Sequence, residues 1–279
     1  MPLPTYDDVL AAAARIAPHA HATPVLRSRA LDALAGCELH FKAEPLQRTG
    51  AFKFRGACNA VWALDEATAA RGVVTHSSGN HGAALALAAR TRGIPCHVVV
   101  PEGAVRSKLE AIEASGAVVH RCEATLSARE TACSKVQAET GATLVHPYTT
   151  AEVIAGQGTA ALELLTAHPD LDALVVPVGG GGLISGIAFA IKTLRPEVKV
   201  YGVQAEGAPS MYRSLHEHKY QTLKSASTFA DGLQVKTPGE LTYQICEQYV
   251  DDIVTVSEDE TAAAILSLME NQKLVAEGA

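Results

Sequence analysis

Short apolar runs alternate with helix-like segments along most of this chain, and that alternation limits the possible folds more than any other feature. Six runs have the length and composition of strands: Val73–His76, Cys96–Val100, Val118–Arg121, Thr143–His146, Ala173–Val178 and Val198–Val203. Helix-like segments begin near Asn80, Ser107, Ser127, Glu152, Gly182 and Ser210. Strands separated by helices of about 10 to 15 residues predict right-handed crossovers and a parallel sheet, hence an α/β fold. The continuous apolar run Ala173–Val178 predicts a sheet covered on both faces.

Composition excludes several classes of function. The net charge is −7 and no basic stripe is present, which argues against a nucleic-acid partner or an anionic membrane surface. No apolar run approaches the roughly 20 residues needed to span a bilayer. The first helix is predicted over Tyr6–Ile16, capped by Thr5, and it lacks the pattern of a secretion signal. Six cysteines without a CxxC pair indicate buried, reduced thiols and a cytoplasmic protein.

A lysine, Lys53, stands where a helix is predicted to begin. The chain turns at Thr49-Gly50 and enters that helix behind Phe52. The positive end of a helix dipole lowers the pKa of an amine and attracts anions. A neutral lysine beside an anion site is what Schiff-base chemistry requires. Taken alone, a solvated lysine opening an ordinary helix is the better interpretation, because most lysines are exposed.

The four glycines Gly179–Gly182 lie between an apolar strand and a predicted helix. Glycines allow several backbone N–H groups to surround one phosphate, since no Cβ blocks the approach. The helix N-terminus adds a favourable dipole. The pattern is neither a Walker A motif nor a GxGxxG dinucleotide motif. A flexible connection between strand and helix is the alternative interpretation.

A second polar turn, Ser77–His81, also follows a predicted strand and precedes a helix. Exposed N–H groups and hydroxyls at such a turn can bind a carboxylate. The alternative is ordinary helix capping by Ser78 or Asn80.

In this order and spacing, the lysine segment, Thr75–Gly82 and Val176–Gly182 resemble the fold type II family of pyridoxal 5′-phosphate (PLP) enzymes. The serine/threonine dehydratase and serine racemase branch is the most similar. The resemblance implies a tryptophan synthase β-like fold, in which a smaller parallel-sheet domain (72–148) is inserted into a larger one (1–71 and 149–279). Family members continue for several dozen residues, so part of the C-terminal large domain is expected to be missing. An incomplete sheet would leave an apolar face uncovered.

The resemblance also assigns roles to individual residues. Lys53 would hold PLP and act as the base, and Ser78 would be the acid/base on the opposite face. The implied cofactor contacts are Phe52, Lys53, Asn80, Gly179, Gly180, Gly181, Gly182 and Glu277. The implied substrate contacts are Ser77, Ser78, Gly79, Asn80, His81, Arg129, Asp231 and Gly232.

A divalent cation is a weaker expectation. Serine racemases bind one through a glutamate that Glu206 matches, but the aspartate six residues later is Tyr212 here. A phenol cannot replace a carboxylate for a hard cation. Glu206 could instead cap the helix expected at Ser210. His76 and His81 have no further ligands at metal-binding spacing.

The function implied is PLP-dependent dehydration of L-threonine or L-serine to a 2-keto acid and ammonia. The dehydratase-like segments EGAPSMY and LVAEGA favour it. Ser78 favours the alternative, a serine racemase with side dehydratase activity. A third hypothesis is an inert PLP-like binding protein. The resemblance further implies a homo-oligomer, a dimer or a tetramer, acting on a small amino acid.

Overall fold

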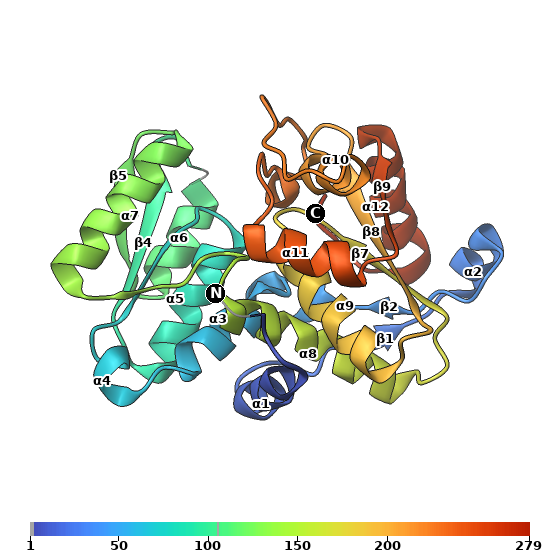
Figure 1. The fold of residues 1–279 in the computed structure, drawn as a ribbon, viewed down its shortest axis with the longest axis horizontal. Helices are drawn as coiled ribbons and strands as arrows, with labels where there is room; N and C mark the ends of the chain where they lie inside the picture. The colour runs from blue at the N-terminus through green and yellow to red at the C-terminus, as the bar shows by residue number, and fades with distance from the viewer. Residues whose placement is uncertain (1–2, 105) are drawn as a thin grey trace.

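Two parallel sheets, each with its own helices, make up the computed structural model, which describes residues 3–104 and 106–279 (Figure 1). The helices are α1 Tyr6–Ile16, α2 Arg29–Ala35, α3 Lys53–Trp62, α4 Glu66–Ala69, α5 Asn80–Arg92, α6 Arg106–Ala114, α7 Leu126–Thr140, α8 Ala151–Ala167, α9 Gly182–Leu194, α10 Ser210–His216, α11 Glu240–Tyr249 and α12 Glu258–Gln272. Single 3-10 turns are η1 Glu44–Leu46, η2 Arg48–Gly50 and η3 Asp231–Leu233. The strands are β1 Val25–Leu26, β2 Phe41–Lys42, β3 Val73–His76, β4 Cys96–Pro101, β5 Val118–Cys122, β6 Thr143–Leu144, β7 Ala173–Pro177, β8 Lys199–Ala205 and β9 Asp252–Val256.

The first sheet has the strand order β5-β4-β3-β6 and all of its pairs are parallel. Alternate residues of β4 face opposite sides of the sheet and belong to different hydrophobic cores. Val98 and Val100 pack with α5 and α6, whereas Val99 packs with α7. Both faces of this sheet are therefore covered. Strand β6 ends two residues before the predicted His146, because the His146 N–H donates to the Thr150 hydroxyl and the chain leaves the sheet.

The second sheet has the order β7-β8-β9 and is also parallel. Leu174 and Val176 are buried in the core that α9 shares, but Val175 is 68% exposed and Val254 is 46% exposed. The prediction that the Ala173–Val178 run is covered on both faces is therefore wrong within the described residues. In the part of the chain that the structure describes, one face of this sheet exposes Val175 and Val254.

Helix α8 holds α3 and α9 through contacts between glycine backbones. A Cβ added to Gly156 would lie 2.7 Å from the Arg55 carbonyl oxygen on α3. A Cβ added to Gly186 on α9 would lie 2.3 Å from the Ile154 oxygen and 2.6 Å from the Gly158 nitrogen. Backbone atoms packed this closely cannot shift independently. The start of α3 and the start of α9 therefore have a fixed separation.

Replacing Gly186 with alanine is expected to lower the free energy of unfolding by about 1–3 kcal/mol, the usual cost of overpacking a core. The new methyl group would meet backbone rather than a movable side chain. Urea denaturation monitored by circular dichroism measures the effect. Thr193→Ala, on the exposed end of the same helix, is the control and should change little. An unchanged midpoint for Gly186→Ala would contradict the close contact with α8.

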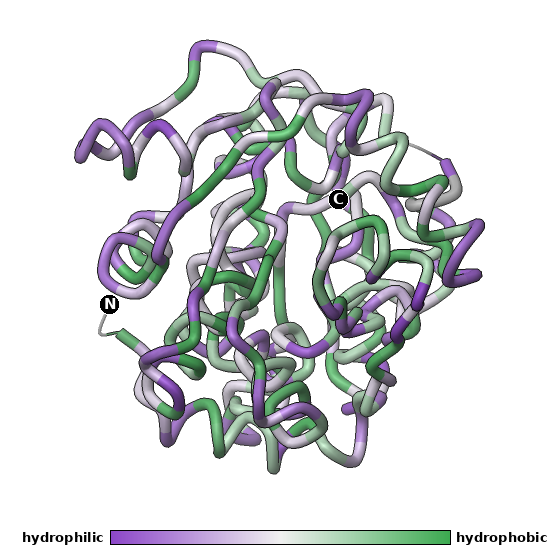
Figure 2. Tube along the Cα trace, turned by 90° about the vertical axis from the view of Figure 1, so that its right-hand side faces the viewer, coloured by the Kyte–Doolittle hydropathy of each residue, from purple (hydrophilic) through white to green (hydrophobic). Residues whose placement is uncertain are grey.

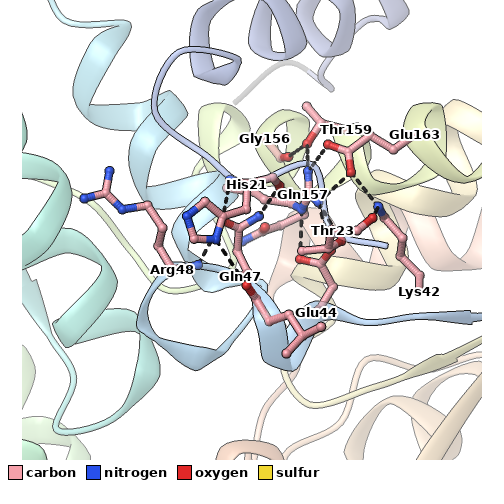
Figure 3. A network of polar contacts seen from close by, with 12 residues as sticks. His21, Thr23, Lys42, Glu44, Gln47, Arg48, Gly156, Gln157, Thr159 and Glu163 are labelled. Carbon is pink, nitrogen blue, oxygen red and sulfur yellow. Dashed lines mark hydrogen bonds and ion pairs between the residues drawn. The ribbon is translucent and has the colours of Figure 1, made fainter. Parts of the chain in front are cut away.

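A buried ionic network fixes the first turns of α3. Arg55 is fully buried and donates to Glu44 at 2.8 Å and to Glu163 at 2.6 Å. Lys42 donates to the other oxygen of Glu163 at 2.5 Å, and the Thr23 hydroxyl donates to Glu44 at 2.6 Å. Figure 3 shows Thr23, Lys42, Glu44 and Glu163 converging from separate segments. The network joins η1, α3 and α8. Its central residue, Arg55, follows Lys53 by two positions in α3.

Hydrophobic stretches of the trace run through the interior, and hydrophilic stretches gather at outer turns (Figure 2). The cysteines are free, and four of them are buried. The prediction of buried thiols is wrong for Cys37, which is exposed in the loop after α2, and only partly right for Cys122. Within the described residues, no helix has both the length and the apolar character to cross a membrane.

Candidate active site

Three helices that carry predicted site residues begin without a side-chain cap. They are α3 at Lys53, α5 at Asn80 and α9 at Gly182. The first N–H groups of a helix have no partner within it, so each start offers donors for an anion. The N-cap of α5 is Gly79, so the alternative that Ser78 or Asn80 caps this helix is wrong.

The Lys53 amine lies against the stretch that follows β6. Its Nζ donates to the Pro147 carbonyl oxygen at 3.0 Å and lies 5.2 Å from the centre of the Phe52 ring. Burial lowers the pKa of Lys53 to about 8, and the nearby Glu277 carboxylate partly opposes that shift. The lowered pKa agrees with the expectation from sequence, although burial causes it. About a tenth of this amine is therefore neutral at pH 7, far more than for an ordinary lysine with a pKa of about 10.4, and the neutral form is the one that acts as nucleophile or base.

The rate at which an aldehyde attaches to Lys53 is expected to rise with pH to a plateau whose midpoint is near 8. Only the neutral amine reacts, so the rate should grow about tenfold per pH unit below that midpoint. Mixing apo-protein with PLP across a pH series and following the cofactor's absorbance measures this dependence. A midpoint near 10.4, the ordinary lysine value, would show that the amine is not desolvated.

The four glycines form a tight turn between β7 and α9. Gly181 has φ of +94°, and its carbonyl oxygen accepts the first helical hydrogen bond, from Ser185 at 2.9 Å. The N–H groups of Gly181, Gly182 and Leu183 consequently have no acceptor within the helix. These donors are available to an anion, as the predicted cradle requires.

The segment after β6 brings the amine and the glycines together. Pro147 accepts the Lys53 hydrogen bond, and the next residue, Tyr148, covers the glycine turn. A Cβ added to Gly180 would lie 2.5 Å from the Tyr148 ring, and one added to Gly182 would lie 2.9 Å from the Tyr148 Cβ. Glycine is therefore required at these two positions by packing against Tyr148.

Other predicted residues gather at the same place. The Asn80 side-chain amide donates to Glu277, whose carboxylate also acts on Lys53. A Cβ added to Gly179 would lie 3.2 Å from the Gly232 carbonyl oxygen, which places the Asp231-Gly232 turn beside the glycines. Residues more than 200 positions apart in the chain thus meet around one amine.

The Ser77–His81 turn contains side chains of different character. The Ser77 hydroxyl accepts from Gly79 at 3.3 Å, whereas the Ser78 hydroxyl has no hydrogen bond within the described residues. His81 is buried, its Nε2 lies 3.0 Å from the Val145 carbonyl oxygen, and burial lowers its pKa to about 3. His81 is thus a neutral ring held in the core, while Ser78 is free to contact a ligand.

Arg129 lies on α7 and is partly buried. Burial lowers the pKa of His76, and the positive charge of Arg129 lowers it further. Burial raises the pKa of Tyr148 to about 12, and the positive charge of Arg129 opposes that rise, so Arg129 lies near the residue that covers the glycine turn. This position is compatible with the predicted contact to a substrate anion.

The side chains around Glu206 do not support the expected cation site. Glu206 is exposed, and no group of three His, Cys, Asp or Glu side chains in the described part of the chain could hold a metal ion. The alternative that Glu206 caps α10 is wrong, since the N-cap is Pro209 and no side chain bonds there. Tyr212 instead donates its backbone N–H to the buried Gln204 at 2.9 Å.

Sequence reasoning missed Pro147, Tyr148 and Thr242 as parts of the site. Thr242, on α11, contacts the Gly180 carbonyl oxygen at 2.6 Å. One signal was available for Tyr148: it follows the predicted strand Thr143–His146, and ligands of parallel sheets bind at the carboxyl ends of strands. For Thr242 no sequence signal exists.

These residues fit PLP. An aldehyde needs an amine that it can reach and that is in part neutral, and the partly buried Lys53 side chain, with its pKa lowered to about 8, fits both needs. A phosphate needs convergent donors without side chains between them, and the start of α9 supplies backbone N–H groups on glycines.

Comparison with known proteins supports this interpretation. Residues 16–279 match a family described as "Pyridoxal-phosphate dependent enzyme". The serine racemase of Arabidopsis thaliana is 48% identical, over 94% of this chain and 79% of that protein. The L-threonine ammonia-lyase of Thermotoga maritima is 45% identical, over 99% of this chain and 69% of that protein. The structure of maize serine racemase matches with a TM-score of 0.97 at 42% identity, covering 99% of this chain and 84% of the maize chain. This likeness confirms the predicted α/β fold class.

Proposed function

The chain belongs to the family of pyridoxal-phosphate dependent enzymes and has the type II fold, and on that premise we propose that it deaminates a β-hydroxy amino acid. L-threonine would yield 2-oxobutyrate and ammonia, and L-serine would yield pyruvate and ammonia. An ammonia-lyase and serine racemases among its relatives support this substrate class.

The chain's own residues would perform distinct tasks. When bound, PLP withdraws electrons from the substrate's α-carbon and so weakens its bond to hydrogen. Lys53 accepts the α-proton as general base. The turn Ser77–His81 holds the α-carboxylate at the start of α5, and Arg129 and Asp231-Gly232 lie at the edges of the site. The β-hydroxyl leaves as water, and later addition of water with loss of ammonia gives the keto acid.

One observation carries the proposal. Lys53, whose pKa is lowered to about 8, donates to Pro147, and the adjacent Tyr148 packs on a glycine turn whose first N–H groups have no partner within the helix. A lysine with a purely structural role would not require a lowered pKa, and a turn that only binds phosphate would not require an amine nearby. The two features side by side therefore indicate a functional site. Together they match the aldehyde and the phosphate of PLP.

Racemisation is the second candidate, and the free Ser78 hydroxyl favours it. After Lys53 removes the α-proton, Ser78 would return a proton from the other face and yield the D-amino acid. Both reactions begin with the same proton removal, so one site can perform both.

Two further proposals concern organisation. We propose a small unit at 72–148, which contains the whole β5-β4-β3-β6 sheet, inserted in a larger unit at 1–71 and 149–279. We also propose a cytoplasmic homo-oligomer, a dimer or a tetramer. The free cysteines support a reducing compartment.

The test incubates purified, PLP-loaded protein with L-threonine and with L-serine and measures keto acid and D-enantiomer together. Keto acid as the main product supports the ammonia-lyase. D-serine in excess of pyruvate would assign racemisation instead. Cofactor bound without either product would overturn both and leave an inert binding protein.

A further inference from the structure

We propose that Thr242 is a positioning residue for the phosphate group of the cofactor, which it affects through the glycine turn without touching the ligand. Its hydroxyl sets the orientation of the peptide between Gly180 and Gly181, and so the direction of one cradle N–H. This inference rests on the proposed cofactor site and adds a residue from α11 to it.

The contacts of Thr242 are short and fully enclosed. The residue is completely buried, and its Oγ1 lies 2.6 Å from the Gly180 carbonyl oxygen and 3.0 Å from the Gly239 carbonyl oxygen. A hydroxyl has one proton to donate, and the shorter distance assigns it to Gly180. The Gly239 N–H donates to the same Gly180 oxygen at 3.2 Å. Two donors at the start of α11 therefore hold one carbonyl.

The held carbonyl determines where the next N–H points. A peptide bond is planar and trans, so the Gly181 N–H points away from the Gly180 carbonyl and hence away from α11. Gly181 has φ of +94° and no side chain to limit rotation of this peptide. Without the Thr242 bond, only the longer bond from the Gly239 N–H, at 3.2 Å, would hold the carbonyl of this peptide between two glycines.

Packing around Thr242 leaves no room for another group to take over this role. A Cβ added to Gly181 would lie 2.8 Å from the Thr242 Oγ1, and one added to Gly239 would also lie 2.8 Å from it. The Ser185 hydroxyl, in the first turn of α9, donates to the Thr242 carbonyl oxygen at 3.4 Å. Thr242 thus joins α11 both to the glycine turn and to the helix that the turn begins.

Two substitutions separate the hydroxyl from the packing. Thr242→Val keeps the size of the side chain but removes the donor, which leaves the buried Gly180 oxygen with the Gly239 N–H alone. Thr242→Ser keeps the donor and removes the methyl group. We expect the dissociation constant for PLP to rise about 5- to 100-fold in Thr242→Val, the range for an unmade buried hydrogen bond, and to change little in Thr242→Ser.

A phosphate-free probe distinguishes positioning from general damage. Pyridoxal carries the same aldehyde but no phosphate, so its affinity should be equal in the wild-type protein and in Thr242→Val. Both dissociation constants are measured on apo-protein by titration of the fluorescence of the single Trp62, with equilibrium dialysis as a second measurement. Neither measurement requires turnover.

Equal weakening of PLP and pyridoxal in Thr242→Val would assign a merely structural role and overturn the inference. Unchanged PLP affinity in Thr242→Val, or weakening in Thr242→Ser as large as in Thr242→Val, would also overturn it. If Thr242→Val does not fold, Thr242→Ser and Thr242→Ala are compared with the same two probes, and Thr242→Ala must then show the selective loss. Failure of the wild-type protein to bind PLP would refute the proposed function, a distinct outcome.

Discussion

Replacement of Lys53 with alanine is expected to abolish covalent attachment of PLP and to lower keto acid formation by about 10⁴-fold or more. The substitution removes both the amine that carries the cofactor and the base that takes the α-proton, and a general base alone contributes about 10²- to 10⁴-fold. The partly buried side chain lies beside the Phe52 ring and outside the hydrophobic cores, so the fold should remain intact.

Attachment is measured by borohydride treatment followed by mass determination, and activity by keto acid release from L-threonine. Lys219→Ala, which removes an exposed lysine, is the matched control and should retain both. A Lys53→Ala protein that still gains the mass of the reduced cofactor would show that another amine is the attachment point. Circular dichroism of the variant confirms that the loss does not come from unfolding.

Replacement of Arg55 with methionine is expected to destabilise the protein by about 3–5 kcal/mol, the usual result of breaking a buried ionic network by removing one partner. Glu44, whose side chain is only 14% exposed, would then be a buried carboxylate without its cation. Glu163 would keep Lys42 as a partner. The same change should loosen the first turns of α3, so affinity for PLP should fall as well.

The network also predicts how stability depends on pH. Burial by itself would raise the pKa of Glu163, but hydrogen bonds from Arg55 and Lys42 outweigh burial and lower it. A carboxyl with a lowered folded pKa contributes stability that is complete above its unfolded value, about 4.3, and is lost as pH falls through the folded value. The wild-type protein should therefore lose this contribution on acidification, and Arg55→Met should lose less.

Urea denaturation across a pH series measures both effects. Arg106→Met is the control, because Arg106 pairs with Glu110 on an exposed helix face where such pairs contribute little. If Arg55→Met is as stable as the control, the network does not contribute to the fold in the way its geometry implies. If the two proteins lose stability equally in acid, Glu163 is not the group that titrates.

Features that depend on neighbouring residues could be predicted from the sequence. Helix α1 was predicted over Tyr6–Ile16 with Thr5 as its cap, and the structure has these bounds and a capping box. Lys53 was predicted at a helix entrance and starts α3, and the glycines were predicted between a strand and a helix and lie between β7 and α9. Local periodicity and cap residues act over three or four positions, so they are readable without the fold.

Elements of the C-terminal third were missed. Strand β9 includes a charged residue and exposes alternate positions, and α12 has little apolar periodicity. Helix α11, by contrast, has an apolar face that buries Leu241, Ile245 and Cys246, so its pattern was readable from the sequence. Burial on β7 was misjudged for a related reason: an apolar run in the sequence does not reveal whether a layer covers its second face. Val175 remains 68% exposed. Whether a second layer covers a sheet face depends on segments far away in the chain, so a local sequence pattern cannot predict it.

By itself, the sequence determined the α/β class, the lysine, the glycine turn and the family to which they point, because each depends on residue types at short spacing. Only the tertiary structure decided how the residues of the candidate site meet. Burial gives Lys53 its lowered pKa, and Pro147-Tyr148 joins it to the glycine turn. Thr242 bonds to a carbonyl 62 residues away in the chain. Such contacts depend on which helix ends pack together, and no short-range pattern encodes that.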